Sequence, residues 1–329
     1  ANSVLSTGLW YKVAVSETGL HKISFEDFVQ MGFSGSQLSS SLISVFGNGT
    51  GRLPEVCGTD RPDDLLELPV LVHDGGDGVF GAGDYVVFYA KSPHNVSFDP
   101  STRTFSHDYN IYTDNSYYFV NLSGAGEGKR VTMGAETALT ENPTALDYLN
   151  YKYYEVDAVN LDETGQEWFG DLFDVTAQRD YSIEIPSVKA ETAKFTIAAA
   201  SSAASSSIFS VTVNGSSIGA LPISAMSGAI AHREKGTFSF TPTQSTLSIS
   251  LNFNRSSSLT KGYLDYLAVQ ATSQLSFSGG QLNFNNGKYI SNNAVSRYTI
   301  SNANSSVRVW DVTEPSKAFQ LPGSYNGST

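Results

Sequence analysis

Cys57, the only cysteine of the chain, is the first residue to consider for covalent chemistry. A cysteine nucleophile reacts as its thiolate and needs a base such as histidine together with surroundings that favour the charged form. Cys57 stands in the acid-rich segment PEVCGTDRPDD (54–64), where nearby carboxylates disfavour a thiolate. We interpret Cys57 as an incidental loop cysteine and predict no catalytic residue in the chain. A single cysteine also excludes an internal disulfide framework.

The glycine-rich segment GNGTGR (47–52) has the composition of a loop that could hold phosphate. Such loops work when consecutive backbone N–H groups meet the N-terminus of a helix. Here Leu53 and Pro54 follow, and no helix begins. We therefore predict a turn whose glycines let two strands approach closely.

Asp77 and Asp84 are the candidate metal ligands. Asp77-Gly78 followed by Asp84 imitates the second half of a calcium-binding loop, with an acid, a turn glycine and a later acid. The first half does not fit, because His73 and Gly75 stand where oxygen ligands are needed. We favour an acidic hairpin between two strands over a bound calcium ion, and we predict no other metal and no cofactor.

Carboxylates also occur in pairs such as Asp63/Asp64 and Glu163/Glu167, and acid–base catalysis needs two such groups held across a cleft. The chain has 32 acidic residues and a formal net charge of −12, so solvated surface is the favoured interpretation. Two carboxylates within apolar segments are expected to hydrogen-bond loops or to face water: Asp265 and Asp311.

Aromatic residues are abundant, with 17 Tyr, 19 Phe and 3 Trp. Trp168 and Trp310 are the candidate ligand-binding or interface residues, because an exposed aromatic face can stack on a sugar ring or fill a pocket in a partner. Packing between sheets is the favoured alternative for these and for the other aromatics considered with them: Trp10, Tyr117, Tyr118, Tyr151, Tyr153 and Tyr154.

The acidic balance of the chain limits its partners. A net charge of −12 and a pI of about 4.8 oppose binding to nucleic acid or to an anionic membrane. No apolar run is long enough for a transmembrane helix. Hydrophobic residues make up 40% of the chain, which is enough apolar material for a packed core.

The elements that would position these residues are almost all strands, so we predict an all-β fold with one minor helix. Residues 10–25 alternate apolar and polar side chains around a turn at 17–19, which predicts a hairpin. A short helix is expected from Ser24 or Phe25 to Gly32. With these, the following strands form a β-rich N-terminal domain over residues 1–146: 42–47, 68–73, 84–90, 110–115, 116–122 and 129–133.

A polar connection at 134–147 leads to a second domain, predicted over residues 147–329. Its alternation is regular, as in LSISLNF (247–253), which predicts strands with one buried face. We predict a jelly-roll-like β-sandwich, with a loop and strand edge in the serine-rich segment 201–210. The later strands of this domain are expected at 262–270, 281–285, 296–301 and 307–312.

Eight segments of the chain match one known family in the same order: WYKVAV with GLHKISF (10–25), VFGNGTGRLPE (45–55), RPDDLLELPV (61–70), DGVFGAGDYVVFYA (77–90), YNIYTDNSYYFV (109–120), GQEWFGDLF (165–173), GYLDYLAV (262–269) and VWDVT (309–313). They resemble the N-terminal region of the type IX secretion sortases, the PorU-type proteins of the gingipain cysteine-peptidase family. No single segment is decisive, but eight in register are difficult to obtain by chance.

In that family a peptidase domain follows this region and carries a catalytic cysteine and a histidine that precedes glycine. No histidine of this chain precedes glycine, because the following residues are Lys22, Asp74, Asn95, Asp108 and Arg233. The resemblance therefore implies a non-catalytic region of a larger enzyme. We expect the peptidase domain to lie beyond Thr329.

The resemblance also implies a location and a role. The family's proteins act at the outer membrane, where they remove a C-terminal sorting signal from exported cargo and join the cargo to a lipopolysaccharide anchor. We expect an exported protein in the periplasm or on the outer-membrane surface of a Gram-negative, Bacteroidetes-like bacterium. Its β domains would position the peptidase domain and engage cargo or secretion-system proteins. The alternative is a carbohydrate-binding module that uses the surplus aromatics.

Overall fold

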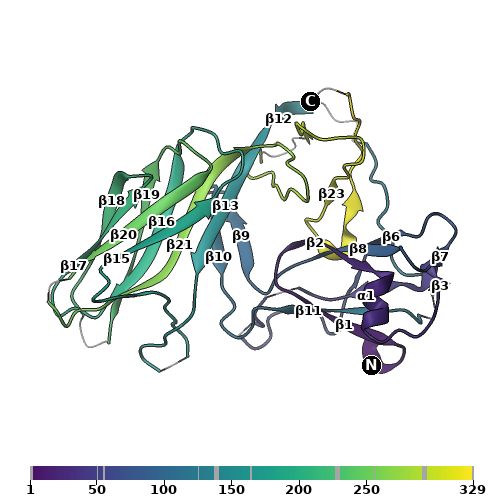
Figure 1. The fold of residues 1–329 in the computed structure, drawn as a ribbon, viewed down its shortest axis with the longest axis horizontal. Helices are drawn as coiled ribbons and strands as arrows, with labels where there is room; N and C mark the ends of the chain where they lie inside the picture. The colour runs from purple at the N-terminus through teal and green to yellow at the C-terminus, as the bar shows by residue number, and fades with distance from the viewer. Residues whose placement is uncertain are drawn as a thin grey trace.

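The computed structural model describes residues 3–49, 51–54, 56–124, 126–136, 141–163, 165–226, 230–255, 257–290 and 295–327. Their regular secondary structure is almost all strand, arranged in two β-rich parts side by side (Figure 1). The predicted all-β fold with one minor helix is therefore confirmed. Three short 3-10 helices accompany the strands: η1 (Val4–Ser6), η2 (Ser40–Leu42) and η3 (Pro315–Lys317).

The first domain contains two antiparallel sheets around one apolar core. The sheets have the orders β1-β11-β4-β5 and β2-β8-β6, and a small pair, β3-β7, lies beside them. Phe28, Val45, Val86 and Phe88 are fully buried between these elements. The strand bounds are β1 (Trp10–Val15), β11 (Ser116–Asn121), β4 (Ser44–Phe46), β5 (Glu67–Leu68), β2 (Gly19–Ser24), β8 (Tyr85–Ala90), β6 (Val70–His73), β3 (Leu38–Ser39) and β7 (Val79–Phe80).

The hairpin predicted over residues 10–25 is wrong, although both of its strands exist. β1 pairs with β11, whereas β2 pairs with β8 in the other sheet. Each strand turns apolar side chains to the shared core, with Val15 on β1 and Ile23 on β2. The chain therefore crosses between the sheets at this turn, because both apolar faces are buried that way.

The predicted helix is α1 (Phe25–Gln30). Ser24 caps its N-terminus by accepting a hydrogen bond from the amide of Asp27, and the Asp27 carboxylate accepts one from the amide of Ser24. Gly32 follows with φ +99°, a conformation that ends the helix. Its buried Phe25 and Phe28 attach the helix to the core.

Three features of this region differ from the prediction. Residues 110–115 form a turn rather than a strand, in which the Asn110 side chain accepts a hydrogen bond from the amide of Tyr112. The region also contains an unpredicted hairpin, β9 (Asn95–Asp99) with β10 (Thr104–Asp108). Residues 129–133, predicted as a strand, make only single bridges at Arg130 and Met133.

The second domain is a β-sandwich. One sheet has the order β13-β21-β16-β19, with β14 also paired to β21, and the other has the order β15-β20-β17-β18. Between them lies a core that includes the fully buried Phe195, Ile197, Leu247 and Ile249. Its strands are β13 (Asp147–Glu155), β14 (Leu172–Phe173), β15 (Gln178–Glu184), β16 (Ala193–Ser201), β17 (Ser207–Val213), β18 (Ser216–Ile223), β19 (His232–Phe240), β20 (Thr246–Asn254) and β21 (Gly262–Gln274).

Regular alternation predicted this sandwich correctly. β17 and β20 bury alternate residues, whereas β15 and β19 alternate exposed residues with less exposed ones, and β16 is buried continuously from Ile197 to Ser201. Residues 202–206 form the expected loop between β16 and β17. β13 was not predicted, and the jelly-roll-like connectivity and the boundary at residue 146 stay predictions. Of the last strands, 281–285 has no strand, while 296–301 and 307–312 shorten to β22 (Val295–Tyr298) and β23 (Trp310–Asp311).

The chain returns to the first domain after the sandwich (Figure 1). β22 pairs in parallel with β12 (Glu141–Ala145), inside the segment expected to be a polar connection, and β23 pairs with β24 (Phe319–Gln320). The Gln281 side chain accepts a hydrogen bond of 2.8 Å from the amide of Leu20. In the part of the chain that the structure describes, no helix has the length and apolar character to cross a membrane.

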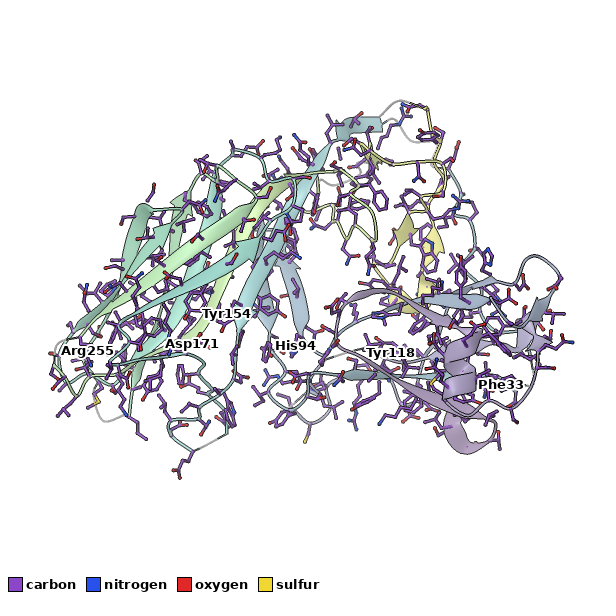
Figure 2. The ribbon with its side chains drawn as sticks, viewed as in Figure 1. Phe33, His94, Tyr118, Tyr154, Asp171 and Arg255 are labelled. Atoms are coloured by element: carbon purple, nitrogen blue, oxygen red, sulfur yellow. The ribbon has the colours of Figure 1, made fainter. Side chains whose placement is uncertain are left out.

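Hairpin β9–β10 is the second link between the domains, because it extends from the first domain onto the sandwich. The amide of Phe105 donates to Gln270 Oε1 at 3.0 Å, and Gln270 Nε2 donates to the carbonyl oxygen of Arg103 at 2.9 Å. In Figure 2, His94 lies between the two domains, next to the start of β9. We call this contact between hairpin β9–β10 and the sandwich the domain seam.

Candidate functional site

A cleft of about 250 Å³ lies at the domain seam. His107 on β10 forms one side. The opposite side is the outer face of the β13-β21 sheet, with Glu155 at the end of β13 and Asp265 on β21. The loop between β13 and β14 adds Asp157 and Trp168. We call this site the seam cleft.

His107 is the centre of the contact between hairpin and sandwich. Its side chain is 3% exposed, and Nε2 donates to Glu155 Oε2 at 2.6 Å. In the neutral ring, Nδ1 then accepts a hydrogen bond of 2.5 Å from the Tyr151 hydroxyl. The ring also stacks on Tyr153, with centroids 4.0 Å apart, and meets Tyr266 edge to face. Tyr151, Tyr153 and Glu155, three alternate residues of β13, therefore lie on one face of the strand and contact the histidine.

Asp157 and Asp265 set the electrostatics of the seam cleft. Burial raises the pKa of Asp157 to about 6, and the carboxylates of Glu155, Asp265 and Asp114 add to this rise. Asp157 Oδ2 is buried and has no hydrogen-bond partner in the described structure. Asp265 accepts hydrogen bonds from Arg233 Nε at 2.8 Å and Nη2 at 2.5 Å. Burial nevertheless raises the pKa of Asp265.

This arrangement suits the binding of a polar ligand by hydrogen bonds and stacking. It does not place a nucleophile beside a base. The two ring nitrogens of His107 are hydrogen-bonded to Tyr151 and Glu155, and Cys57 is exposed and lies outside the lining of the cleft. Among the described residues, no group of three or more His, Cys, Asp or Glu side chains is arranged to hold a metal ion. We therefore treat the seam cleft as a candidate binding site.

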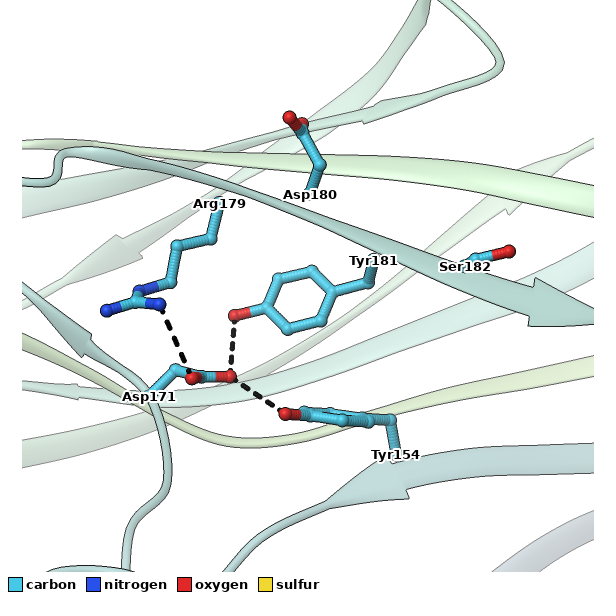
Figure 3. A pocket seen from close by; sticks show the side chains of 6 residues that line it. All are labelled: Tyr154, Asp171, Arg179, Asp180, Tyr181 and Ser182. Carbon is cyan, nitrogen blue, oxygen red and sulfur yellow. Dashed lines mark hydrogen bonds and ion pairs between the residues drawn. The ribbon is translucent and has the colours of Figure 1, made fainter.

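A second hollow, of about 320 Å³, lies at the corner between β14 and β15 (Figure 3). Asp171 Oδ2 accepts hydrogen bonds of 3.0 Å from the hydroxyls of Tyr154 and Tyr181, and Arg179 Nη1 lies 3.6 Å from Asp171 Oδ1. Burial raises the pKa of Tyr181, so its hydroxyl stays protonated and donates. These polar groups bind one another, and we assign the hollow a structural role.

The two candidate tryptophans do not share the seam cleft. Trp168 lines it, and its indole Nε1 donates to the carbonyl oxygen of Gly165 at 3.1 Å. Trp310 lies on β23 opposite Gln320 and is outside the lining. A ligand-binding role for either residue stays a prediction.

The two candidate metal ligands each cap a turn. Asp77 Oδ1 accepts a hydrogen bond of 2.8 Å from the amide of Val79, and Asp84 Oδ2 accepts one of 2.7 Å from the amide of Gly81. These contacts are those of the acidic turns that the sequence favoured. Calcium binding at Asp77 and Asp84 stays a prediction.

Two glycines of the segment 47–52 lie close to a side chain, Tyr118, and Thr50 is outside the described residues. A Cβ at Gly47 would lie 2.3 Å from the Tyr118 ring, and one at Gly49 would lie 2.3 Å from the Tyr118 hydroxyl. The other predicted residues are scattered. Asp64 accepts from the amides of Val4 and Leu65, Glu167 lines the seam cleft without Glu163, and Asp311 accepts from the amide of Thr313.

Sequence reasoning missed His107, Glu155, Asp157 and Arg233, and it expected Asp265 to bind a loop or water rather than Arg233. These residues come from β10, β13, the following loop, β19 and β21. One local signal existed, because YKYYE (151–155) places two tyrosines and a glutamate on the same face of a strand. A carboxylate among aromatics on one face indicates a partly buried ionisable site.

The chain is similar in structure to dimeric latent PorU from Porphyromonas gingivalis, with a TM-score of 0.82 and 21% sequence identity. The match covers 99% of this chain and 30% of that one, so the chain spans less than a third of the PorU length. The chain therefore has the fold of the matched PorU region. The fold expected from the sequence resemblance is confirmed.

Other solved structures match far less well. A carbohydrate-binding module of family CBM36, solved with calcium and xylotriose, has a TM-score of 0.24 and 13% identity over 35% of this chain and 86% of its own. The endotoxin Cry8Ea1 from Bacillus thuringiensis has a TM-score of 0.27 and 12% identity, over 72% of this chain and 42% of its own. Neither supports an assignment. No protein-family model matches the chain, and no curated protein matches it.

Proposed function

We propose that this chain is a non-catalytic β region of a PorU-like sortase of the gingipain family, and that it acts as a scaffold for the rest of that protein. The observation that carries the proposal is the shared fold, with a TM-score of 0.82 over 99% of the chain. The eight sequence segments that resemble the family support it independently. In this proposal the parent is a peptidase of exported cargo, and catalysis belongs to another domain.

The domain seam supports a scaffold rather than a flexible tether. His107 is almost fully buried between the two domains, and Gln270 binds two backbone groups of the hairpin. The C-terminal segment adds the contact between Gln281 and Leu20. Contacts on both sides of the seam oppose rotation of one domain against the other.

The remaining parts of the proposal concern location and partners. The protein would be exported, in the periplasm or on the outer-membrane surface of a Gram-negative bacterium. Its first partner would be the peptidase domain of the same protein, and exported cargo or secretion-system proteins would be further partners. The net charge of −12 opposes nucleic acid as a partner.

The test is made in the source bacterium, on the gene that encodes this chain. Removal of the coding segment for residues 10–321 is expected to leave exported cargo with its sorting signal attached, as seen by mass spectrometry of the cargo. Cys57→Ala in the intact gene is the control and is expected to leave processing unchanged. Normal processing without the segment, or a reading frame without a peptidase domain, would refute the proposal.

Carbohydrate binding is a second candidate, favoured by one observation: Trp168 lines a cleft that also contains Asp157 and Glu167. Aromatic stacking with carboxylate hydrogen bonds is a chemistry that suits sugars. Glycan-array binding that is lost in Trp168→Ala and kept in Trp310→Ala would support this function. Absence of binding to any glycan by the folded chain would remove it.

A further inference from the structure

The end of the sandwich farthest from the first domain is formed by four loops that follow β14, β16, β18 and β20. Arg255, labelled at the far left of Figure 2, belongs to the last of these loops. We call the described residues of these loops the sandwich tip: 174–177, 202–206, 224–226, 230–231, 255 and 257–261. Three backbone hydrogen bonds join the loops and neighbouring strands: Ser202 N to Lys261 O at 2.9 Å, Met226 N to Ala203 O at 2.8 Å, and Phe253 N to Ala177 O at 2.8 Å.

Large apolar side chains protrude from the sandwich tip. Val175 is 88% exposed and Leu259 is 87% exposed, the highest values among the exposed large hydrophobic residues of the described chain. Their loops are neighbours, because Phe173 pairs with Gly262 where the two loops leave the sheet. Met226, on a third loop, is also exposed. Several apolar side chains are therefore presented to solvent together.

The charge of the sandwich tip is opposite to that of the whole chain. Arg255 and Lys261 are both exposed, and Asp174 is the one carboxylate among the described tip residues. The chain as a whole carries −12. A local excess of cations beside apolar side chains on an acidic protein indicates a surface for an anionic, partly apolar partner.

We infer that the sandwich tip binds the interface of a lipid bilayer that carries anionic headgroups. Val175 and Leu259 would enter the boundary between headgroups and acyl chains, and Arg255 would contact the headgroup phosphates. A bilayer fits this shape, because separate side chains on convex loops need no complementary groove in a fluid surface. A protein partner would instead need a surface that complements these separate side chains in shape.

The net charge of −12 predicts repulsion from an anionic membrane, but the sandwich tip carries a different charge from the rest of the molecule. The side that the chain turns toward a bilayer therefore decides the force that it meets. Salt screens charges beyond about 8–10 Å, so a bilayer that meets the sandwich tip first feels mainly the local charges. The acidic remainder of the molecule then faces water. This inference does not depend on the proposed sortase scaffold, because it concerns the sandwich tip alone.

The experiment is co-sedimentation of the complete 329-residue chain with vesicles of phosphatidylcholine, with and without phosphatidylglycerol. The chain is expected to sediment with the phosphatidylglycerol vesicles and to be released by salt. Val175→Ser combined with Leu259→Ser is expected to weaken binding about tenfold. Arg255→Glu combined with Lys261→Glu is expected to abolish the preference for phosphatidylglycerol.

The matched control is Leu53→Ser combined with Val56→Ser, which removes a Leu and a Val that are 66% and 74% exposed on the first domain. This control is expected to bind as the parent chain does, and circular dichroism shows that each variant is folded. Three outcomes overturn the inference: the chain binds neither kind of vesicle, the control loses as much vesicle binding as the tip variants do, or the tip variants bind vesicles as the parent chain does. Loss of a protein partner in the tip variants without any vesicle binding would assign the surface to that protein instead.

Discussion

Asp157 is a residue at which burial and neighbouring charge act in the same direction. Both raise its pKa, from an ordinary 3.8 to about 6 in the folded protein. A raised pKa means that the folded state binds the proton more tightly than the unfolded state. The stability contributed by this proton is fully present below pH 3.8 and is lost as the pH rises through about 6. At neutral pH, the ionised Asp157 therefore destabilises the fold.

Asp157→Asn is expected to be more stable than the parent chain at pH 7.5, because the amide removes the charge beside Glu155 and Asp265. The melting temperature should rise by about 2 °C at that pH, a modest value because solvent screens a partly exposed group. The difference should shrink as the pH falls below 6. Thermal melts between pH 3.5 and 8 test this, and a constant difference across that range would contradict the assigned pKa.

The same residues show what could be predicted at this scale. Trp168 could be selected from the sequence, because a large aromatic in a polar segment stands out by its type alone. Asp157 and Arg233 could not, because their environment arises from contacts between distant elements. Nothing in the sequence around Arg233 identifies Asp265 as its partner.

At the level of single elements, two glycines of the segment 47–52, Gly47 and Gly49, pack against one side chain. Tyr118 is 2% exposed, its hydroxyl donates to the carbonyl oxygen of Lys91, and the Lys91 amide donates to that hydroxyl. The backbone of Gly47 reaches the ring only because it has no Cβ. The local sequence predicted a turn where two strands approach closely, but it did not predict that the glycines pack against the Tyr118 side chain.

Gly47→Ala is expected to destabilise the first domain by about 2 kcal/mol, because a methyl group there would overlap the Tyr118 ring. Gly126→Ala is the matched control, since a Cβ at Gly126 meets no atom within 4 Å and no positive φ is involved. Its effect should stay within about 0.5 kcal/mol. Urea unfolding of the two variants measures both values, and equal stability would show that Tyr118 moves aside without cost.

The segment after β21 is attached to β13 through a buried carboxylate. Asp147 is 5% exposed and accepts hydrogen bonds from Lys189 at 2.7 Å, from Lys288 at 3.0 Å and from the Tyr289 hydroxyl at 2.6 Å. Burial alone would raise the pKa of Asp147, but these donors lower it. Its stabilising contribution is therefore present above pH 3.8 and is lost as the pH falls below that value.

Asp147→Asn is expected to lower the free energy of unfolding by about 2 kcal/mol, because it leaves the ammonium groups of Lys189 and Lys288 beside a neutral amide. Trypsin should then cleave after Lys288 faster than in the parent chain, which mass spectrometry of the fragments detects. Glu191→Gln is the control, because Glu191 binds the same lysines but is 41% exposed, and it should cost less than about 0.5 kcal/mol. If Glu191→Gln lost more stability than Asp147→Asn, the segment after β21 would instead be attached mainly through the exposed ion pairs of Glu191.

Strands that share one core were easier to predict than elements whose partners lie in another sheet or in another domain. The regular strands of the sandwich follow from alternation, because one face of each is buried in a single core. β1 and β2 were assigned to the correct residues, yet their pairing was wrong because pairing depends on which sheet buries each face. Hairpin β9–β10 was missed because Ser97 and His107 are polar residues that face a second domain or water rather than an apolar core.

At the scale of the whole molecule, the domain seam decides whether the two domains behave as one body. His107 supplies hydrogen bonds to Tyr151 and Glu155, and Gln270 satisfies the amide of Phe105 and the carbonyl group of Arg103. Removal of the buried histidine is costly, because its partners then remain unpaired. The seam is therefore expected to couple the unfolding of the two domains.

His107→Ala combined with Gln270→Ala tests this coupling. The parent chain is expected to unfold in one calorimetric transition, whereas the double variant should show two, with faster hydrogen exchange in residues 95–108. The buried histidine alone should contribute about 2–3 kcal/mol, because its removal leaves the Glu155 carboxylate and the Tyr151 hydroxyl unpaired. His232→Ala is the matched control: its pair with Glu234 is 42% and 39% exposed, so its loss should cost less than about 1 kcal/mol and leave one transition. A single transition in the double variant would mean that the C-terminal segment couples the domains without the seam, and the scaffold would then depend on Gln281 and Asp147.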